Sequence, residues 1–457
     1  MTILGIELND AAITAADSSG VMYREPGYAI VSDGTMLFGR DAAAFRRLQP
    51  RRMHSHFWQL MSEQALLADG GDCRTHADIV YAHLQYIWQA SGANAEAVVF
   101  ALPPLWSAEQ NGLLLGIAEE IGIPVRGLVA SGVAAARQEY TGCKLYHLEA
   151  TLHDAYLQHV DQDGAAIAGE FHIYEGTGLA VLQQACVAYI ARRLLESSRF
   201  DALQDASNEQ LILNSLAAWL RDLHQAGTTE ISIEHGEWSF EATLDLQELQ
   251  TELLRCLEPL LQQLRAVLPV DEPVALQLHD ELGQFPGLVD LLAEQTGAAI
   301  FILEPAAAAR GAVARASQFS SGSGSLSLTR QLSWDEAAIP VDVSGAPRTG
   351  GTAPTHLVWG SRAFRLGNEP VLAGVSLPED VAGICLEPAA GISRHHFTVE
   401  PDAGGYRLQD HSRYGTWLNG HRLDGGVMLR AGDVITVGPH RLLLVAEQSL
   451  PEVPAGA

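Results

Sequence analysis

Lysine is almost absent from this chain of 457 residues. Lys144 is the single lysine, so a lysine that clamps a phosphate could only be Lys144. Positive charge is scarce altogether, because 28 lysine and arginine residues stand against 55 acidic residues, which gives a net charge of −27. A surface of that sign repels nucleic-acid phosphates and anionic membranes at long range, so we expect neither as a partner.

Cysteine is also rare, and long apolar runs are missing. The cysteines are far apart in the sequence and lack the close spacing of a metal site; they are Cys73, Cys143, Cys186, Cys256 and Cys385. We therefore expect no metal site and free thiols in a reducing compartment. No apolar run reaches about 18 residues, and no basic-then-apolar leader opens the chain. These absences predict a cytoplasmic protein without a membrane insertion.

Strand and helix patterns alternate over the first two thirds of the chain. The continuous apolar run 97–102 is typical of a buried strand. A helix is expected to begin after Ser107, with Gln110 at the capping-box position, and an alanine-rich helix is expected over 133–140. This alternation predicts an α/β architecture with largely parallel sheet.

A change of composition divides the chain. From 318 to 354 the periodic pattern gives way to Ser, Gly, Thr and Pro, a composition typical of flexible linkers. We therefore predict an α/β domain over 1–317, a linker over 318–354, an all-β domain over 355–447 and a disordered tail over 448–457.

Several stretches of the first domain, taken in order, resemble the nucleotide-binding domain of DnaK-type chaperones (heat shock protein 70 family). They are GIEL, YREPGYAIVSDGTMLFGRDAAAF, VVFALPPLWSAEQ, LVASGVAAA, KLYHLEATLHDAYL, EISIEHGEWSFEATLDLQELQ and ILEPAAAARGAVARA. The resemblance covers about 1–317 and implies an actin-like ATPase fold, in which two RNase H-like lobes enclose a cleft for ATP and Mg²⁺. The chaperone's substrate-binding domain and lid have no counterpart here, so a conventional chaperone cycle is not expected.

The resemblance places the nucleotide cleft at Glu7, Asn9, Asp10, Thr151 and Asp154, and the motifs of this cleft depart from the family. The family has an Asp where Glu7 stands, and it has glycines that let backbone N–H groups approach the phosphates. Asn9 and Asp10 replace Gly-Thr of the first loop. A carboxylate beside a phosphate adds repulsion, roughly 4 kcal/mol at contact near a surface, which is enough to remove most affinity.

The second phosphate hairpin and the adenosine strand depart in the same way. His147 stands where the family has Asp, and Glu149 replaces a glycine of the turn. His279 and Asp280 replace the Gly-Gly that follows the adenosine strand, and Ser131 replaces the Glu of the hinge. We therefore predict a pseudo-ATPase that needs no cofactor. ATP with Mg²⁺ stays an open alternative, because Glu7, Asp10 and Asp154 could still hold a metal ion.

Two weaker patterns have competing readings. A basic patch is formed by Arg46, Arg47, Arg51, Arg52, His54 and His56; it could bind a metal ion or nucleic acid, and the simpler interpretation is a solvated segment. The tryptophans Trp106, Trp238 and Trp417 are expected to be packing residues rather than ligand platforms. No nucleophile elbow or paired-carboxylate signature stands out.

The stretch GISRHHFTVEPDAGGYRLQDHSRYGTWLNG, residues 391–420, resembles a forkhead-associated (FHA) domain. The Asn-Gly pair at its end favours a hairpin turn. The resemblance covers about 355–447 and implies a β-sandwich whose loops bind phosphothreonine peptides. It assigns structural roles to Gly367, His396, Gly415, Thr416, Asn419 and Gly420.

The resemblance places phosphopeptide binding at Ser393, Arg394, Arg413 and Tyr414. The family's phosphate-binding Arg is replaced by Asn368, and the Asn that touches the peptide backbone is replaced by Tyr414. Arg394 and Arg413 could substitute for the missing Arg, because bidentate arginine suits a phosphate. Binding that depends on phosphate and binding that ignores it both stay open.

The two resemblances together predict a non-catalytic scaffold or adaptor. Its FHA-like domain would bind protein partners, and its first domain would be a pseudo-ATPase. In bacteria FHA domains are often associated with Ser/Thr kinase signalling or with secretion assemblies, and the resemblance permits either. The alternative is an ATP-dependent conformational switch of the heat shock protein 70 type that regulates an FHA-bound partner.

Overall fold

The computed structural model describes residues 2–32, 34–66, 73–92, 95–269, 272–319, 326–341, 354–359, 362–377, 383–389, 391–402, 405–418, 421–423, 425–429, 431 and 433–446. The chain forms two compact units. The first unit contains residues 1–257, 274–291 and 299–342, and the second contains 258–273, 292–298 and 343–457. Within the described ranges no helix is long and apolar enough to cross a membrane. Cys73 and Cys186 are buried, and Cys385 is exposed.

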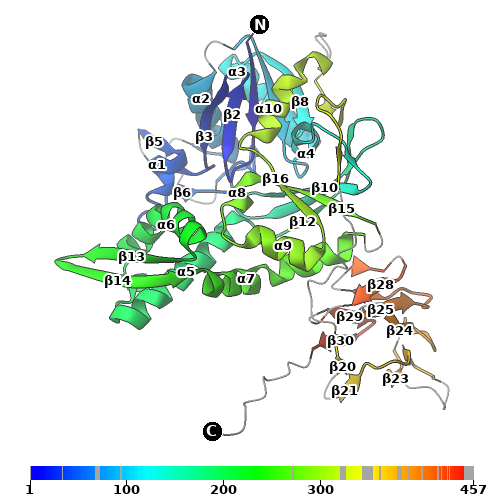
Figure 1. The fold of residues 1–457 in the computed structure, drawn as a ribbon. Helices are drawn as coiled ribbons and strands as arrows, with labels where there is room; N and C mark the ends of the chain where they lie inside the picture. The colour runs from blue at the N-terminus through cyan, green and yellow to red at the C-terminus, as the bar shows by residue number, and fades with distance from the viewer. Residues whose placement is uncertain are drawn as a thin grey trace. The chain divides into compact units, whose positions relative to one another are not determined.

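Two six-stranded sheets form the first unit (Figure 1). The first sheet has the order β17–β8–β7–β1–β2–β3, with β1 (Ile3–Glu7), β2 (Ile13–Asp17), β3 (Gly20–Glu25), β7 (Ala97–Leu102), β8 (Val125–Ala130) and β17 (Leu328–Thr329). The second sheet has the order β16–β15–β10–β11–β12–β18, with β10 (Lys144–Ala150), β11 (Ala155–Asp161), β12 (Ala166–Tyr174), β15 (Val274–Leu278), β16 (Ala299–Ile302) and β18 (Gln331–Leu332).

The two sheets repeat one topology. In each, three consecutive strands pair antiparallel, and the first of them pairs parallel with a later strand that has a further parallel neighbour. Strand β7 is buried at all its positions, as the apolar run predicted, because a parallel strand covered on both faces must be apolar throughout. The prediction of an α/β architecture is confirmed, but the two sheets are mixed rather than largely parallel, because three consecutive strands of each pair antiparallel.

Helices and small sheets complete the first unit. The helices are α1 (Gly39–Ala43), α2 (His76–Ser91), α3 (Ala108–Ile121), α4 (Ser131–Ala135), α5 (Leu179–Ser198), α6 (Ala206–Ala226), α8 (Asp280–Gly283) and α10 (Ala307–Ala314), while α7 (Leu246–Val267) and α9 (Leu288–Thr296) have residues in both units. The small sheets join β4 (Ala29–Ser32) with β5 (Thr35–Phe38) and β6 (Met53–His54), and β9 (Tyr140–Thr141) with β19 (Ile339–Pro340). The capping box of α3 is present, with Ser107 Oγ accepting from Gln110 N.

Helix α4 is shorter than the alanine-rich pattern predicted. It ends at Ala135, and Ala136 is extended. The cause is Arg315, which is 1% exposed and donates to the carbonyl oxygens of Val133, Ala134 and Ala136. These bonds satisfy the carbonyl groups at the helix end, so the helix need not continue to be stable.

Part of the predicted linker is packed. Residues 326–341 contain β17, which pairs parallel with β8, and β18, which pairs antiparallel with β12. Leu332 of β18 is 1% exposed and belongs to a core of the first unit. This segment therefore hydrogen-bonds to both sheets; the limits of the linker itself stay a prediction.

A long hairpin is formed by β13 (Thr228–His235) and β14 (Trp238–Asp245), and its strands contact α6 and α5, respectively (Figure 1). Trp238 at the turn of this hairpin is 72% exposed, so the prediction that it packs in a core is wrong. It lies beyond the buried part of the hairpin, where no apolar neighbour covers it. Trp106 is 7% exposed and packs in a core as predicted.

The second unit contains a β-sandwich-like region of two largely antiparallel sheets. One has the order β21–β20–β30–β29–β26–β27, with β20 (His356–Trp359), β21 (Arg362–Arg365), β26 (Trp417–Leu418), β27 (His421–Arg422), β29 (Val434–Val437) and β30 (His440–Val445). The other has the order β23–β22–β24–β25–β28, with β22 (Val371–Gly374), β23 (Gly383–Cys385), β24 (Phe397–Asp402), β25 (Gly405–Asp410) and β28 (Val427–Leu429). Buried apolar residues of both sheets share one core, for example Leu357, Phe397 and Leu442.

Candidate functional site

Polar side chains gather at the ends of strands in the first unit, buried between its two sheets. We call them the polar cluster: Glu7, Asn9, Ser131, His147, Glu149 and His279. All six are at most 5% exposed. Glu7 ends β1, Ser131 follows β8 and His279 follows β15, so the carboxyl ends of parallel strands bring distant residues together, as in other α/β sheets.

Glu149 is the centre of the polar cluster. Its Oε1 accepts from Asn9 Nδ2 at 2.6 Å, and its Oε2 accepts from Ser131 Oγ at 2.9 Å and lies 3.1 Å from His147 Nε2. Asn9 Nδ2 also donates to the carbonyl oxygen of Ala150 at 3.0 Å. The loop after β1 is therefore bonded directly to the second sheet, and both carboxylate oxygens of Glu149 are occupied.

Glu7 and His279 form the second pair of the polar cluster. Glu7 Oε1 lies 3.1 Å from His279 Nε2. Burial alone would lower the pKa of His279, but the hydrogen bond and charge of Glu7, together with Glu149 and Asp280, outweigh it and raise that pKa to about 10. His279 is therefore an imidazolium at neutral pH, buried between carboxylates.

The charge of Glu149 matches this arrangement. Burial opposes its ionisation, but the hydrogen bond from His147 and the charges of His279 and His147 outweigh burial and lower the pKa of Glu149 to about 2. The cluster thus holds buried charges that are paired and hydrogen-bonded, which is the condition under which buried charges are tolerated.

Asp10, Thr151 and Asp154 lie beside the polar cluster and hold loops. Asp10 Oδ1 accepts from Leu152 N at 2.7 Å, and Thr151 Oγ1 donates to the carbonyl oxygen of Asp154 at 2.9 Å. Asp154 accepts from Gly176 N at 2.8 Å and from the side-chain amide of Gln59. The structure therefore brings all five predicted cleft residues into one region, where they bond to protein groups.

Three side chains of the polar cluster have a geometry that suits a divalent cation. Glu7, Glu149 and His279 each contribute one ligand atom, and these three atoms lie within 4.8 Å of one another. Two carboxylates and an imidazole are a donor set that Zn²⁺ accepts. A cation would have to displace the proton of His279, because imidazole binds metal only when neutral.

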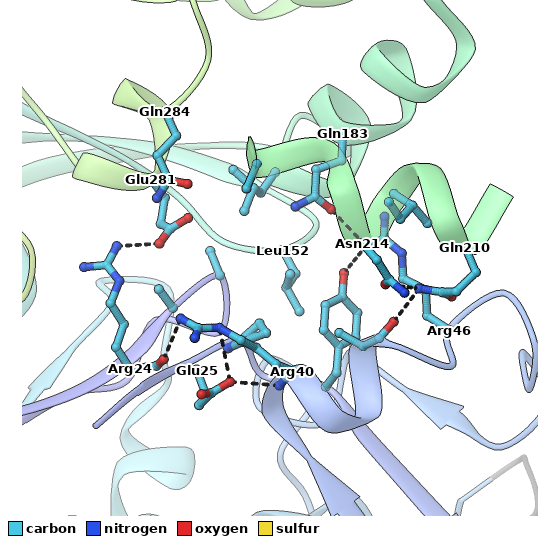
Figure 2. A pocket seen from close by; sticks show the side chains of 18 residues that line it. Arg24, Glu25, Arg40, Arg46, Leu152, Gln183, Gln210, Asn214, Glu281 and Gln284 are labelled. Carbon is cyan, nitrogen blue, oxygen red and sulfur yellow. Dashed lines mark hydrogen bonds and ion pairs between the residues drawn. The ribbon is translucent and has the colours of Figure 1, made fainter. Parts of the chain in front are cut away.

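A cavity of about 330 Å³ lies in the same unit, and Figure 2 shows its lining. Arg24 pairs with Asp280 at 2.5 Å and with Glu281. Arg46 Nη1 donates to Tyr28 Oη at 2.7 Å and to Gln183 Oε1 at 2.9 Å (Figure 2). Among the described residues no carboxylate pairs with Arg46, so a cation in this wall is not neutralised.

The basic patch is thus not simply a solvated segment. Arg46 reaches α5 through Gln183, and Arg47 Nε pairs with Glu209 Oε1 of α6 at 2.9 Å. His56 stacks on His153, with ring centroids 3.5 Å apart. Because these three groups bond across the first unit, packing accounts for their positions.

The second unit places His396 beneath the loops that the FHA resemblance assigned to binding. His396 is 0% exposed; its Nδ1 accepts from Ser393 N at 3.0 Å and its Nε2 lies 3.2 Å from the carbonyl oxygen of Gly415. Only a neutral ring with the proton on Nε2 can make both bonds. Burial lowers the pKa of His396 and keeps the ring neutral. His396 therefore joins the two loops, as predicted.

Asp410 fixes the second of these loops, and the sequence interpretation missed it. It accepts from Ser412 N at 2.9 Å, from Thr416 N at 3.2 Å and from Thr416 Oγ1 at 2.8 Å. Burial raises the pKa of Asp410, but these hydrogen bonds outweigh burial and lower it. Gly415 has a φ of +100°, and a side chain there would meet Arg422, so this position requires glycine.

Gly374 is a second residue that the sequence interpretation missed. A Cβ there would collide with the carbonyl oxygen of Arg394, so the strand end and the loop touch backbone to backbone. Val375 N and Ser376 N donate to the carbonyl oxygens of Ser393 and Arg394, each at 3.2 Å. The only sequence signal was a glycine at the end of an apolar strand, which is common in many folds.

The predicted binding side chains lie at the surface of this region. Ser393 Oγ accepts from Arg413 N at 3.2 Å, which joins the two loops. Arg394 and Arg413 are exposed, and Tyr414 is 59% exposed. In the part of the chain that the structure describes, neither guanidinium has an ion-pair partner.

The remaining predicted structural residues have mixed outcomes. Thr416 is buried and bonded to Asp410, whereas Gly367 is exposed and a Cβ there would meet no atom within 4 Å. The strands on either side of the predicted Asn-Gly turn pair as expected, with Leu418 opposite His421. Asn419 and Gly420 lie outside the described residues.

Comparison with known proteins identifies one part of the chain. Residues 376–438 match the family model of the FHA domain. FHA domains are protein-interaction domains that recognise phosphothreonine through arginine and loop donors, so the FHA resemblance is confirmed over these residues. No curated protein matches the chain.

Proposed function

We propose that this protein is a non-catalytic adaptor that binds a threonine-phosphorylated protein through its FHA region. The observation that carries the proposal is a pair of exposed arginines, Arg394 and Arg413, on the two loops joined by Ser393, and no described carboxylate pairs with either of them. A phosphothreonine has about −1.5 to −2 charges and three acceptor oxygens, and such a group needs guanidinium and hydroxyl donors. The net charge of −27 repels an acidic peptide at long range, so these local cations would be essential.

Fluorescence anisotropy with a phosphothreonine peptide library, compared with the unphosphorylated peptides, tests this proposal. We expect binding to require the phosphate, and each of Arg394→Ala and Arg413→Ala to weaken it by about ten- to a hundred-fold, because a hydrogen bond to a charged group contributes roughly 1.5–3 kcal/mol. Arg365→Ala is the matched control, because Arg365 is exposed on β21 and opposite His356. Binding that ignores the phosphate, or that survives both substitutions, would mean a phosphate-independent partner.

For the first unit we propose a pseudo-ATPase of the actin-like, heat shock protein 70 type. The repeated strand order of the two sheets supports the actin-like part of this proposal. The polar cluster supports the loss of ATP hydrolysis, since Asn9 and Glu149 bond to each other where the family has glycines facing phosphates. Both carboxylate oxygens of Glu149 are occupied, and the carboxylate stays charged. A phosphate in this region would therefore meet repulsion rather than hydrogen-bond donors.

The alternative is an ATP-dependent conformational switch, and one observation favours it. The cavity of about 330 Å³ contains Arg46, a cation that no described carboxylate neutralises. Differential scanning fluorimetry with Mg-ATP separates the two functions, because a ligand that binds the native state raises its melting temperature. We expect no saturable shift. A clear shift, together with ATP turnover that is lost in Glu7→Ala, would establish the switch instead.

A further inference from the structure

A second, larger cavity of the first unit has no role in the proposed adaptor function. Its volume is about 560 Å³, and its wall combines residues from α4 and β9, from β15 and β16 and from α10. Cavities of roughly 300–1,000 Å³ are the size that holds small organic ligands. We call it the β16 cavity, because residues 300–304, in and directly after that strand, line it in succession.

Eight of the 14 residues that line the β16 cavity are apolar or aromatic. The rings of Tyr140 and Phe301 meet edge to face, with centroids 4.7 Å apart. Ile302 is 51% exposed, although it is a large apolar side chain in a strand. Phe301 is partly exposed, and aromatic rings at this spacing favour a further ring.

A buried amide adds one polar group to the wall. Gln277 is 1% exposed, and its Nε2 donates to Tyr140 Oη at 3.2 Å. Its Oε1 has no hydrogen-bond partner among the described residues. The two ends of an amide are exchanged by a simple flip, so either a donor or an acceptor is left unsatisfied. A ligand hydroxyl, which both donates and accepts, suits either case.

The two arginines of the wall differ in how firmly they are held. Arg137 is paired with both Asp335 and Glu336, the latter at 2.6 Å. Among the described residues Arg310 pairs only with Glu304, at 2.6 Å, and the two side chains are 45% and 77% exposed. An exposed pair of this kind contributes little free energy, so a ligand carboxylate can take the place of Glu304 beside Arg310.

From these contacts we infer that the β16 cavity binds a small aromatic carboxylate that also has a hydroxyl group. The ring lies against Tyr140 and Phe301, the hydroxyl satisfies the amide of Gln277, and the carboxylate pairs with Arg310. The inference does not depend on the adaptor function, since none of these residues belongs to the FHA region.

Isothermal titration calorimetry of the full chain with 4-hydroxyphenylacetate tests the inference. We expect saturable binding at about millimolar ligand or below. Phenylacetate, which lacks the hydroxyl, and tyramine, which has an amine in place of the carboxylate, should each bind at least about ten-fold more weakly. These ligand comparisons need no protein variant, so they stay valid if a substitution impairs folding.

Two variants and a matched control complete the test. Arg310→Gln and Gln277→Leu should each weaken 4-hydroxyphenylacetate about ten-fold or more, with folding checked by circular dichroism. Arg255→Gln should leave it unchanged, because Arg255 is another exposed arginine paired with one glutamate, on α7. The inference is overturned by absence of binding at about 5 mM ligand, by equal affinity for phenylacetate, or by unchanged binding to Arg310→Gln.

Discussion

The polar cluster of the first unit and the FHA loops of the second use their charged side chains in opposite ways. In the polar cluster, Glu7 and Glu149 are buried and bonded to other protein groups. In the FHA loops, Arg394 and Arg413 are exposed and have no described ion-pair partner. One set of charges is satisfied by the protein, whereas the other is free for a ligand.

The difference shows that the role of a charged residue depends on whether other protein groups pair with its charge. A buried charge without a partner is costly, so a substitution inside a protein persists only where further partners accompany it. Asn9, His147 and His279 are such partners for the two glutamates. An exposed arginine needs no partner for stability, and it is therefore available for binding.

Loss of Glu149 should have the largest effect on stability. Glu149→Ala removes the buried carboxylate to which Asn9, Ser131 and His147 bond. We expect the free energy of unfolding to fall by about 3–5 kcal/mol, the usual cost of breaking a buried charge pair. Urea unfolding monitored by circular dichroism measures the change. The exposed Glu230→Ala on β13 is the control and should stay within about 0.5 kcal/mol of the unchanged protein.

A smaller effect of Glu149→Ala, near that of the control, would contradict the contrast drawn between the polar cluster and the FHA loops. It would mean that the polar cluster contributes no more than surface charges do, and that water reaches it. The pseudo-ATPase proposal would then lose its main support, since the region would be open to a nucleotide.

The pH dependence of stability should show the charge of His279. Its pKa is about 10 in the folded protein and 6.5 when unfolded, so its stabilisation is full below pH 6.5 and is lost as the pH rises through 10. Asp10, whose pKa burial raises to about 7, loses its own stabilisation as the pH rises to about 8, and this loss is the same in a variant that keeps Asp10. Between pH 7 and 10 the free energy of unfolding should therefore fall, on the order of 3 kcal/mol, relative to His279→Gln.

Urea unfolding of both proteins at pH 7, 8.5 and 10 measures this difference. Because other groups titrate equally in the two proteins, only the change in the difference is assigned to His279. Parallel curves over the whole range would show that His279 is neutral when folded, and that the buried charge pair with Glu7 does not exist.

The FHA loops are joined by the buried His396, and its loss should have an intermediate effect. His396→Ala removes the acceptor of Ser393 N and the donor to the carbonyl oxygen of Gly415, and it leaves a cavity. We expect a local loss of about 2–3 kcal/mol. Hydrogen–deuterium exchange of residues 391–418 should accelerate accordingly. His395→Ala is the control, because that neighbouring ring is exposed; if it accelerates exchange equally, burial of His396 is not what joins the loops.

Local signals in the sequence predicted most of the secondary structure. Ser107 with Gln110 predicted the start of α3, and the run 97–102 predicted β7, because capping and burial are decided by residues close in sequence. The end of α4 could not be predicted in this way. It depends on Arg315, which reaches the helix carbonyls from about 180 residues away.

The same distinction between local and distant contacts applies to the candidate sites. His396 was predictable because its motif is local, whereas the bond between Asn9 and Glu149 joins residues 140 positions apart. No periodicity or spacing in the sequence indicates such a pair. The packing of Leu332 within the predicted linker was also hidden, because its burial depends on the edge of a sheet built from other parts of the chain.

Removal of both surface arginines should have the smallest effect on stability. We expect the double variant Arg394→Ala with Arg413→Ala to unfold within about 0.5 kcal/mol of the unchanged protein, because exposed side chains without partners contribute little. Thermal and urea unfolding of the full chain measure this, with Arg365→Ala as the exposed control. Phosphopeptide affinity should fall in the same double variant, so the two measurements separate binding from folding. A loss of 2 kcal/mol or more would instead give the arginines a structural role and make the FHA loops resemble the polar cluster.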